Sequence, residues 1–263
     1  MAGIKVVVHG ALGRMGQEVL RAVTNAPDME PVGAADGRAQ PGMLALPDGS
    51  GDIPLSNSLA DALSDAQVVV DFSSAAGAMS VLRTASAHHV NAVVGSTGLS
   101  DENYAEASKL ADDNSVGIII APNFAMGAVL LIHLAELAAK YFEYADLTEG
   151  HHEAKIDAPS GTAVAIARAV VAGQSAPFKA PKAEQELIAG ARGGDYEGVV
   201  VHSRRMPGLM AHHEVVFGAL GQTLTIKHDS INRESFMPGV TLAVREVVNR
   251  TGLTVGLDKI MGL

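Results

Sequence analysis

Short apolar runs alternate with stretches of helical spacing along the first half of the chain. Runs of this kind predict strands, and their alternation with helices indicates a parallel sheet that is covered on both faces. The predicted strands are residues 4–8, 31–36, 67–72, 91–95 and 116–121. The predicted helices are residues 13–26, 76–88 and 101–113. Residues 38–57, which are rich in Gly, Pro and Asp, are predicted to form a loop.

The pattern changes after Asn123, where a Pro-Asn pair follows the fifth strand. Strands with short connections now follow one another, which indicates an antiparallel sheet. Residues 173–198 show little periodicity and are predicted to form a mobile loop. The predicted strands are 147–151, 199–204, 214–220 and 223–228, and the predicted helices are 126–142, 160–171 and 238–249.

Together these patterns predict an α/β protein of two domains. The first is a Rossmann-like, doubly wound parallel sheet formed by residues 1–124 and completed by residues 237–263. The second, residues 125–236, is an α+β domain with a mainly antiparallel sheet. A short strand and a turn are expected near the end of the chain.

Composition narrows the class of protein. The chain has 263 residues, of which 48% are hydrophobic, so it can bury a sizeable core. A net charge of -10 argues against a general partner such as nucleic acid or an anionic membrane. Cysteine is absent, which excludes disulfides and thiolate metal sites. No stretch approaches the roughly 20 apolar residues of a membrane span, and no signal-peptide pattern is present, so we expect a cytoplasmic protein.

A glycine-rich segment follows the first predicted strand and opens a helix. It reads Gly10, Ala11, Leu12, Gly13, Arg14, Met15, Gly16. Its G-x-x-G-x-x-G spacing alone is only weak evidence of nucleotide binding. The alternative is a glycine-rich turn that joins a strand to a helix and has no binding function. However, Asp36 ends the next strand, where an acid can accept hydrogen bonds from a ribose. The segment therefore predicts a dinucleotide site, with the pyrophosphate at the helix N-terminus.

The residues around Asp36 bear on the choice of dinucleotide. A carboxylate at this position favours NADH, because a 2′-phosphate would meet a like charge. Arg38 and Arg14 could offset that charge. The sequence thus predicts NADH, NADPH or both as the cofactor, with NADH somewhat favoured.

Two further loops follow predicted strands, at the sheet edge where ligands of α/β proteins bind. They consist of Gly95, Ser96 and Thr97 after one strand, and of Ala121, Pro122, Asn123 and Phe124 after the next. Each alone could be an ordinary turn, whereas the pair is better explained by contact with the nicotinamide half of the cofactor. Phe72, at the end of the third strand, is interpreted as a core residue, with a cofactor contact as the alternative.

The densest chemistry lies between Glu149 and Thr162, which reads E-G-H-H-E-A-K-I-D-A-P-S-G-T. Adjacent residues of a strand point to opposite faces, so only one of His151 and His152 should face a given site. The segment lacks the spacing of a metal site, and acid–base chemistry is favoured instead. Lys155 could be an ordinary surface lysine, but it lies just before a turn that opens a helix.

The turn is Ser160-Gly161-Thr162, and at a helix N-terminus it would bind a carboxylate. Asp157 is expected to orient a neighbour or to cap the turn. His212 and His213 could form a second polar cluster, although a solvated strand end is the favoured interpretation.

With these motifs placed, the chain resembles the 4-hydroxy-tetrahydrodipicolinate reductase (dihydrodipicolinate reductase) family over nearly its full length. The matching motifs are G-x-x-G-R-M-G, V-V-D-F-S, G-S-T-G, A-P-N-F-A, H-H-x-x-K-x-D-A-P-S-G-T, G-x-x-A-H-H-E-V-x-F-G and T-L-T-I-x-H. The histidine- and lysine-containing string is highly specific, whereas the first motif is shared by many dehydrogenases. The chain departs from some relatives at Gly37, which separates Asp36 from the basic Arg38.

The resemblance implies a role for each motif. It implies that His151 donates or accepts a proton, that Lys155 donates one, and that His152 binds the substrate together with the Ser160-Gly161-Thr162 turn. It also implies dinucleotide contacts at Gly10–Met15, Asp36, Gly95–Thr97 and Ala121–Phe124. The implied reaction is hydride transfer from NADH or NADPH to a small cyclic dicarboxylate in lysine and diaminopimelate biosynthesis. A homotetramer formed through the antiparallel sheets is implied as well.

Two alternatives remain at this point. One is another two-domain dehydrogenase, acting on a sugar or polyol, because such enzymes share the strand, turn and helix at the start of the chain. The other is a module that binds the nucleotide without catalysis. Turnover of the cyclic imine that survives Lys155→Ala would favour the first, and NADH binding without any turnover would favour the second.

Overall fold

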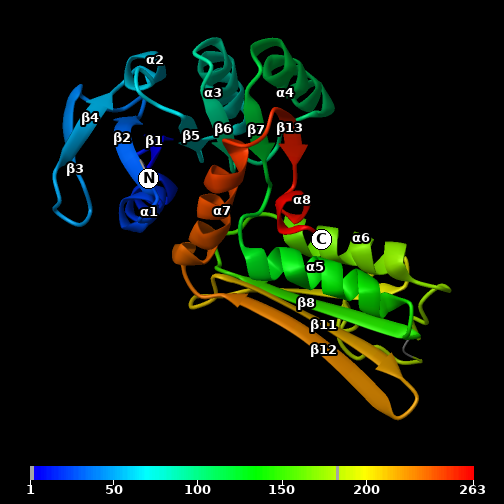
Figure 1. Ribbon diagram of the computed structural model, residues 1–263. Helices are drawn as coiled ribbons and strands as arrows, with labels where there is room; N and C mark the ends of the chain where they lie inside the picture. The colour runs from blue at the N-terminus through cyan, green and yellow to red at the C-terminus, as the bar shows by residue number, and fades with distance from the viewer. Residues whose placement is uncertain (1–2, 182–183) are drawn as a thin grey trace. The chain divides into compact units, whose positions relative to one another are not determined.

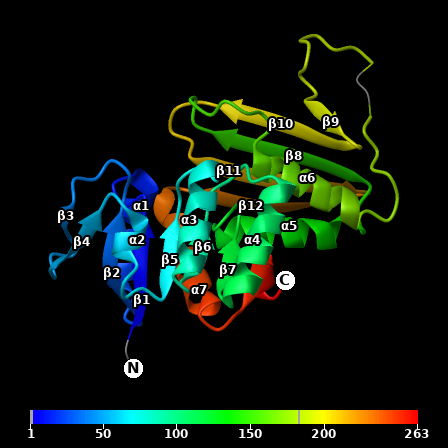
Figure 2. The ribbon, with the colours of Figure 1, turned by 90° about the horizontal axis from the view of Figure 1, so that it is seen from above.

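The computed structural model describes residues 3–181 and 184–263 of the chain. They divide into two compact units, one formed by the chain up to Phe124 together with Phe236–Leu263, the other by Ala125–Ser235. In the described residues, no helix is long and apolar enough to cross a membrane. Each unit has its own sheet (Figures 1 and 2).

The first unit is built on an eight-stranded sheet in the order β13-β7-β6-β5-β1-β2-β4-β3. All neighbours pair in parallel except β3 and β4, which form an antiparallel edge hairpin. The strands are β1 (Ile4–His9), β2 (Met29–Ala35), β3 (Gly42–Ala45), β4 (Asp52–Ser56), β5 (Val68–Asp71), β6 (Asn91–Val94), β7 (Gly117–Ile120) and β13 (Gly252–Val255). Every residue of β5 and β7 is buried, as expected of strands with helices on both faces.

Helices cover both faces of this sheet. Contacts place α1 and α7 next to each other, whereas α2, α3 and α4 follow one another on the opposite face (Figure 1). The helices are α1 (Arg14–Asn25), α2 (Leu59–Ala62), α3 (Ala75–Ala87), α4 (Asp101–Asn114), α7 (Met237–Val247) and α8 (Asp258–Met261). Thus a helix and a strand from the end of the chain complete a sheet that begins at Ile4. The doubly wound fold predicted from the sequence is confirmed.

The second unit packs α5 and α6 side by side on one face of a five-stranded sheet (Figure 1). The sheet has the order β12-β11-β8-β10-β9. Its elements are α5 (Met126–Ala139), β8 (Tyr144–His151), α6 (Gly161–Gly173), β9 (Gly194–Tyr196), β10 (Val199–Arg205), β11 (Ala211–Ala219) and β12 (Gln222–Ser230). A short 3-10 helix, Arg233–Phe236, leads into α7. The core joins alternate residues of β8, such as Ala145 and Leu147, to Ala163 and Ile166 of α6.

Three details differ from the sequence prediction. Residues 38–57 are not only loop, because β3 and β4 form a hairpin whose Gly and Asp residues make the turn. The second sheet is mainly antiparallel as predicted, but β8 and β10 pair in parallel, because α6 carries the chain back across the sheet. The predicted loop at 173–198 contains the short strand β9, and its residues 182–183 lie outside the described part of the chain.

Candidate active site

The turn between β1 and α1 has the backbone that an anion site requires. Gly10 has a φ of +71°, which favours glycine. A Cβ on Gly16 would lie 2.2 Å from the carbonyl oxygen of Gly10, so a larger residue would push the helix away from the turn. Gly13, the N-cap of α1, provides no side chain to cap the first helical N–H groups. These donors therefore fit a phosphate group.

Asp36 lies beside this turn, directly after β2, and is 4% exposed. Its Oδ2 accepts a hydrogen bond from the backbone N–H of Leu12 at 3.1 Å. Arg38 donates to both carboxylate oxygens through Nε and Nη2, each at 3.1 Å. The hydrogen bond from Arg38 lowers the pKa of Asp36 to about 2, so the carboxylate is charged at neutral pH. The turn is thereby fixed to the end of β2.

The other residues predicted to contact the cofactor follow β6 and β7. Because these strands are parallel to β1, their carboxyl ends lie at the same edge of the sheet as Gly10. Thr97 and Pro122 are exposed, whereas Ala121 and Phe124 are buried in the core. The ring of Phe124 contacts Phe72, with 5.4 Å between the ring centroids. A cofactor would thus meet the buried members of this set through their backbone.

In the second unit, the end of β8 holds a buried acid–base pair. Glu149 and His151 are two residues apart, so both side chains lie on the inner face of the sheet. Nδ1 of His151 lies 2.6 Å from Oε2 of Glu149, whose side chain is fully buried. His152 follows the strand and is exposed. The two adjacent histidines thus have different surroundings, as the sequence predicted.

Arg205 completes this pair, although it belongs to none of the sequence motifs that predict the site. It ends β10, in register with His151 on the neighbouring strand. Its Nη2 and Nη1 donate to the two Glu149 oxygens at 2.7 Å and 3.0 Å. Burial alone would raise the pKa of Glu149, but the hydrogen bonds from His151 and Arg205 outweigh it and lower the pKa to about 2. In the sequence, the strand period of two is the signal that could have linked Glu149 to His151.

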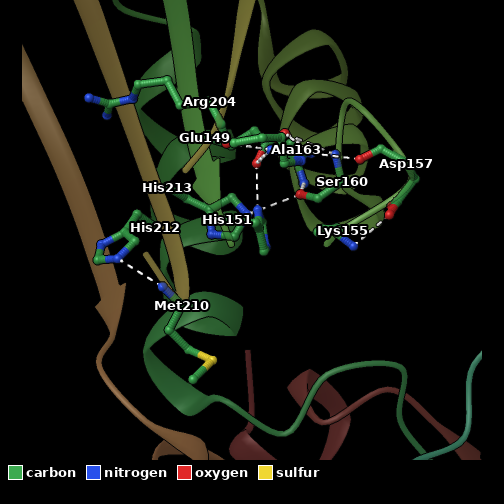
Figure 3. A network of polar contacts seen from close by, with 11 residues as sticks. Glu149, His151, Lys155, Asp157, Ser160, Ala163, Arg204, Met210, His212 and His213 are labelled. Atoms are coloured by element: carbon green, nitrogen blue, oxygen red, sulfur yellow. Dashed lines mark hydrogen bonds and ion pairs between the residues drawn. The ribbon is translucent and has the colours of Figure 1, made fainter. Parts of the chain in front are cut away.

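Lys155 lies in the turn that connects β8 to α6. Its Nζ is 2.7 Å from Oδ1 of Asp157, and its side chain is 24% exposed (Figure 3). This hydrogen bond lowers the pKa of Asp157. The expected role of Asp157 as an orienting residue fits this contact. The ammonium group is therefore held in place, yet can be reached by a ligand.

The Ser160-Gly161-Thr162 turn opens α6. Ser160 is the N-cap, and its Oγ accepts a hydrogen bond from the backbone N–H of Ala163 at 3.1 Å. The backbone N–H of Ser160 donates to Glu149 at 3.3 Å, which ties the helix start to the buried pair. A side chain at Gly161 would meet open space. Arg205 Nη2 also donates to the backbone carbonyl oxygen of Asp157 at 2.6 Å, so Lys155 is connected through Asp157 to the network of His151 and the helix N-terminus.

His213 is the second histidine of this network, which corrects the interpretation of residues 212–213 as a solvated strand end. His213 is 3% exposed, and its ring contacts that of His151 edge-on at 5.4 Å. Its Nε2 lies 3.3 Å from Oγ of Ser160. His212 instead pairs with Asp229 and lies on the other face of β11. The alternation along a strand predicts that His212 and His213 lie on opposite faces. It does not predict which of these faces is buried.

The burial of His213 predicts a pH effect on stability. Desolvation lowers its pKa from 6.5 to about 4, so the folded protein holds a neutral imidazole that the unfolded chain would protonate. Stability should therefore fall as the pH drops from about 6.5 to about 4, by up to about 3 kcal/mol from this group. We expect His213→Gln to reduce this loss, measured as the free energy of urea unfolding at pH 7 and pH 5. An equal loss of stability between pH 7 and pH 5 in the wild type and in His213→Gln would contradict the prediction.

A cavity of about 930 Å³ lies elsewhere in the second unit. Its walls include Pro159 and Ala163 near the start of α6, and Tyr196, His202 and Arg204 around β10. In Figure 3 the side chain of Arg204 points away from His151. His151 and Lys155 are not among its lining residues. The candidate active site is therefore placed by its chemistry rather than by this cavity.

A glycine-rich turn that fits a phosphate at a doubly wound sheet, and a buried acid–base network at a helix N-terminus, are typical of an NAD(P)-dependent oxidoreductase. Two family models extend this to nearly the full chain: "Dihydrodipicolinate reductase, N-terminus" matches residues 4–124, and "Dihydrodipicolinate reductase, C-terminus" matches residues 127–261. The chain belongs to the dihydrodipicolinate reductase family.

Individual relatives agree with the family models. The chain is 48% identical over 265 residues to a 4-hydroxy-tetrahydrodipicolinate reductase of Dehalococcoides mccartyi, with 100% of both chains covered. It is 46% identical to the same enzyme of Cutibacterium acnes, with 99% of each chain covered. Among solved structures, a dipicolinate-bound dihydrodipicolinate reductase from Paenisporosarcina sp. TG-14 has a TM-score of 0.86 and 36% identity, over 98% of this chain and 99% of that one.

Proposed function

We propose that the chain reduces 4-hydroxy-tetrahydrodipicolinate to tetrahydrodipicolinate in lysine and diaminopimelate biosynthesis. The 4-hydroxyl group leaves as water, and NADH or NADPH supplies the hydride to the unsaturated cyclic imine that results. The full-length identity of 48% to a reductase of that name carries this proposal. The chemistry of the network around His151 supports it, because a reduction that adds hydride to an imine also requires a proton.

The two units divide the work in this proposal. The first unit binds the dinucleotide, with the pyrophosphate at the Gly10–Gly16 turn and the adenosine ribose at Asp36. The second unit binds the substrate. The turn that lacks a side-chain cap and the charged Asp36 support the first assignment.

The substrate is a small cyclic dicarboxylate, and the second unit offers matching groups. The Ser160-Gly161-Thr162 turn, His152 and Lys155 hold its carboxylates, since a helix N-terminus and an ammonium group both attract anions. The dipicolinate bound by the Paenisporosarcina relative, also a cyclic dicarboxylate, supports this assignment.

The reduced nicotinamide supplies the hydride. His151 and Lys155 manage the proton: Lys155 Nζ donates, and His151 Nε2 donates or accepts. Glu149 holds Nδ1 of His151 at 2.6 Å and so fixes the orientation of the ring. Arg205 keeps Glu149 charged, which stabilises a positive charge on His151 when it holds the proton.

Oxidation of NADH by the purified protein tests the proposal directly. Freshly prepared 4-hydroxy-tetrahydrodipicolinate should cause a loss of nicotinamide absorbance that depends on the protein. If the nicotinamide absorbance does not fall at any pH with either cofactor, the proposed activity is wrong. Binding of NADH without turnover would leave a nucleotide-binding module.

Cofactor choice depends on Asp36 and Arg38. Asp36→Ala should weaken NADH binding about tenfold, because the substitution removes the carboxylate that accepts a hydrogen bond from the ribose hydroxyl. NADPH binding should be spared, because Arg38 loses its partner and is free to contact the 2′-phosphate. Arg38→Ala should weaken NADPH more than NADH. Dissociation constants measured by nicotinamide fluorescence give both ratios.

The matched control is Asp28, a carboxylate of the same unit that Arg245 contacts at 2.7 Å and 2.9 Å. Asp28→Ala should leave both dissociation constants unchanged. Equal losses for the two cofactors in Asp36→Ala would show that Asp36 does not bind the ribose.

A homotetramer formed through the second unit is part of the proposal. The β11–β12 hairpin exposes Leu220 fully at its tip, and Ile231 is 84% exposed just after β12. Contact with another chain would remove these apolar side chains from water, which favours association. Sedimentation equilibrium should give four times the mass of one chain, and a monomer at micromolar concentration would contradict this part.

A further inference from the structure

A histidine–aspartate pair, of which the aspartate is buried, lies at the point where the order of the strands in the parallel sheet reverses. β1 has β2 on one side and β5 on the other, so the chain crosses over β1 between these strands. His9 is the last residue of β1 and is in register with Asp71, the last residue of β5. In doubly wound sheets, dinucleotides bind beyond the carboxyl ends of the strands at this switch point. The pair therefore lies where a dinucleotide would rest on the sheet.

Asp71 accepts hydrogen bonds from three side chains. Nδ1 of His9 lies 2.6 Å from Oδ1. Ser73 and Ser96 each donate to Oδ2 from Oγ at 3.0 Å. The carboxylate is fully buried, and a buried charge is tolerated only when such partners surround it. Of the three partners, His9 alone can carry a positive charge.

Asp71 also holds the loop after β6. The Ser96 side chain is buried, and the backbone N–H of Gly95 donates to the carbonyl oxygen of Asp71 at 2.8 Å. Both the backbone and the side chain of this loop are thus attached to one residue. The orientation of the Asp71 carboxylate, and with it the position of Ser96, depends on His9.

His9 directly precedes Gly10 and its side chain is 20% exposed. It thereby connects the phosphate-binding turn to the loop at Gly95–Thr97. We propose that His9 is a positioning residue for dinucleotide binding, which acts through Asp71 to hold that loop in its binding position. The inference rests on the proposed dinucleotide site, and it concerns affinity for the cofactor rather than the proton-transfer step.

The test uses the dissociation constant of NADH, measured by nicotinamide fluorescence with no dicarboxylate present. His9→Leu should raise it about tenfold, because Asp71 loses a charge-assisted hydrogen bond and is free to turn. The KM for NADH should rise in parallel, whereas kcat at saturating NADH should change less than about twofold. His9→Asn should restore binding to within about threefold of wild type, because the asparagine amide can donate from near the position of Nδ1.

Two serines provide a matched comparison, because both donate to the same oxygen of Asp71. Ser96→Ala should weaken NADH binding, and adding it to His9→Leu should cause little further loss, since both changes break one linkage. Ser73→Ala removes a hydroxyl donor without touching the loop at Gly95–Thr97, so NADH binding should stay near the wild-type value.

Wild-type affinity in a folded His9→Leu protein would overturn the inference, as would equal losses in Ser73→Ala and Ser96→Ala. If His9→Leu does not fold, His9→Asn and the two serine variants still decide. The proposed activity can fail independently of this inference. If the wild type binds NADH but does not reduce the imine, the proposed substrate is wrong and the role of His9 is unaffected. A wild type that binds neither NADH nor NADPH would remove both.

Discussion

Replacing Lys155 by methionine is expected to lower kcat about 10³-fold, while the dissociation constant of NADH stays within about twofold of wild type. The substitution keeps the length of the side chain but removes its proton and its charge. Because Lys155 lies in the turn of the second unit, its loss should not disturb the dinucleotide turn at Gly10. Stopped-flow or steady-state NADH oxidation gives kcat, and fluorescence titration gives the NADH affinity.

The control is Lys179, another lysine of the second unit, whose Nζ pairs with Glu143. It is 58% exposed and belongs to neither proposed binding site, so Lys179→Met should leave kcat unchanged. A parallel fall in NADH affinity in Lys155→Met would indicate a structural role. Survival of turnover would favour a different reductase chemistry.

Glu149→Gln is expected to damage both stability and turnover. The carboxylate is fully buried between His151 and Arg205, and removing its charge leaves the guanidinium without a counterion. Breaking a buried pair in this way costs about 3–5 kcal/mol of unfolding free energy. The kcat should fall about 10²-fold, because His151 loses the group that orients its ring. Urea unfolding and NADH oxidation measure the two effects.

Asp146 offers a matched comparison on the same strand. It also pairs with a histidine, His202, at 3.1 Å, but its side chain is 48% exposed. Asp146→Asn should therefore cost at most about 1 kcal/mol. Equal losses in the two variants would mean that burial does not distinguish the pairs.

Most of the fold could be predicted from local patterns. The strand expected at 91–95 is β6, Asn91–Val94, and the helix expected at 101–113 is α4, Asp101–Asn114. Long periodic segments with clear caps, such as the Ser100 capping box of α4, specify their own boundaries. The β3–β4 hairpin escaped prediction because it lies at a sheet edge and buries only Ile53 among its hydrophobic residues. The parallel pairing of β8 and β10 is a property of topology, which local spacing does not contain.

The candidate site also combines residues that are close in sequence with residues that only the pairing of strands brings together. His151, Lys155 and the Ser160 turn lie close together in sequence, so their density was visible there. Arg205 and His213 join them only through the pairing of β8 with β10 and β11. His9 and Asp71 are likewise brought together by the register of β1 and β5. Contacts across strands far apart in sequence depend on register, and a single sequence does not reveal it.

The return of α7 and β13 to the first sheet bears on the order in which the protein can form. During synthesis, Ala125–Ser235 emerges from the ribosome before Met237–Val247 and Gly252–Val255 do. The second unit can therefore acquire its core first, although it comes later in the chain than β1. The first unit can be completed only after α7 and β13 have followed. Nascent chains that stall in this interval expose a sheet without its final strand and one of its covering helices.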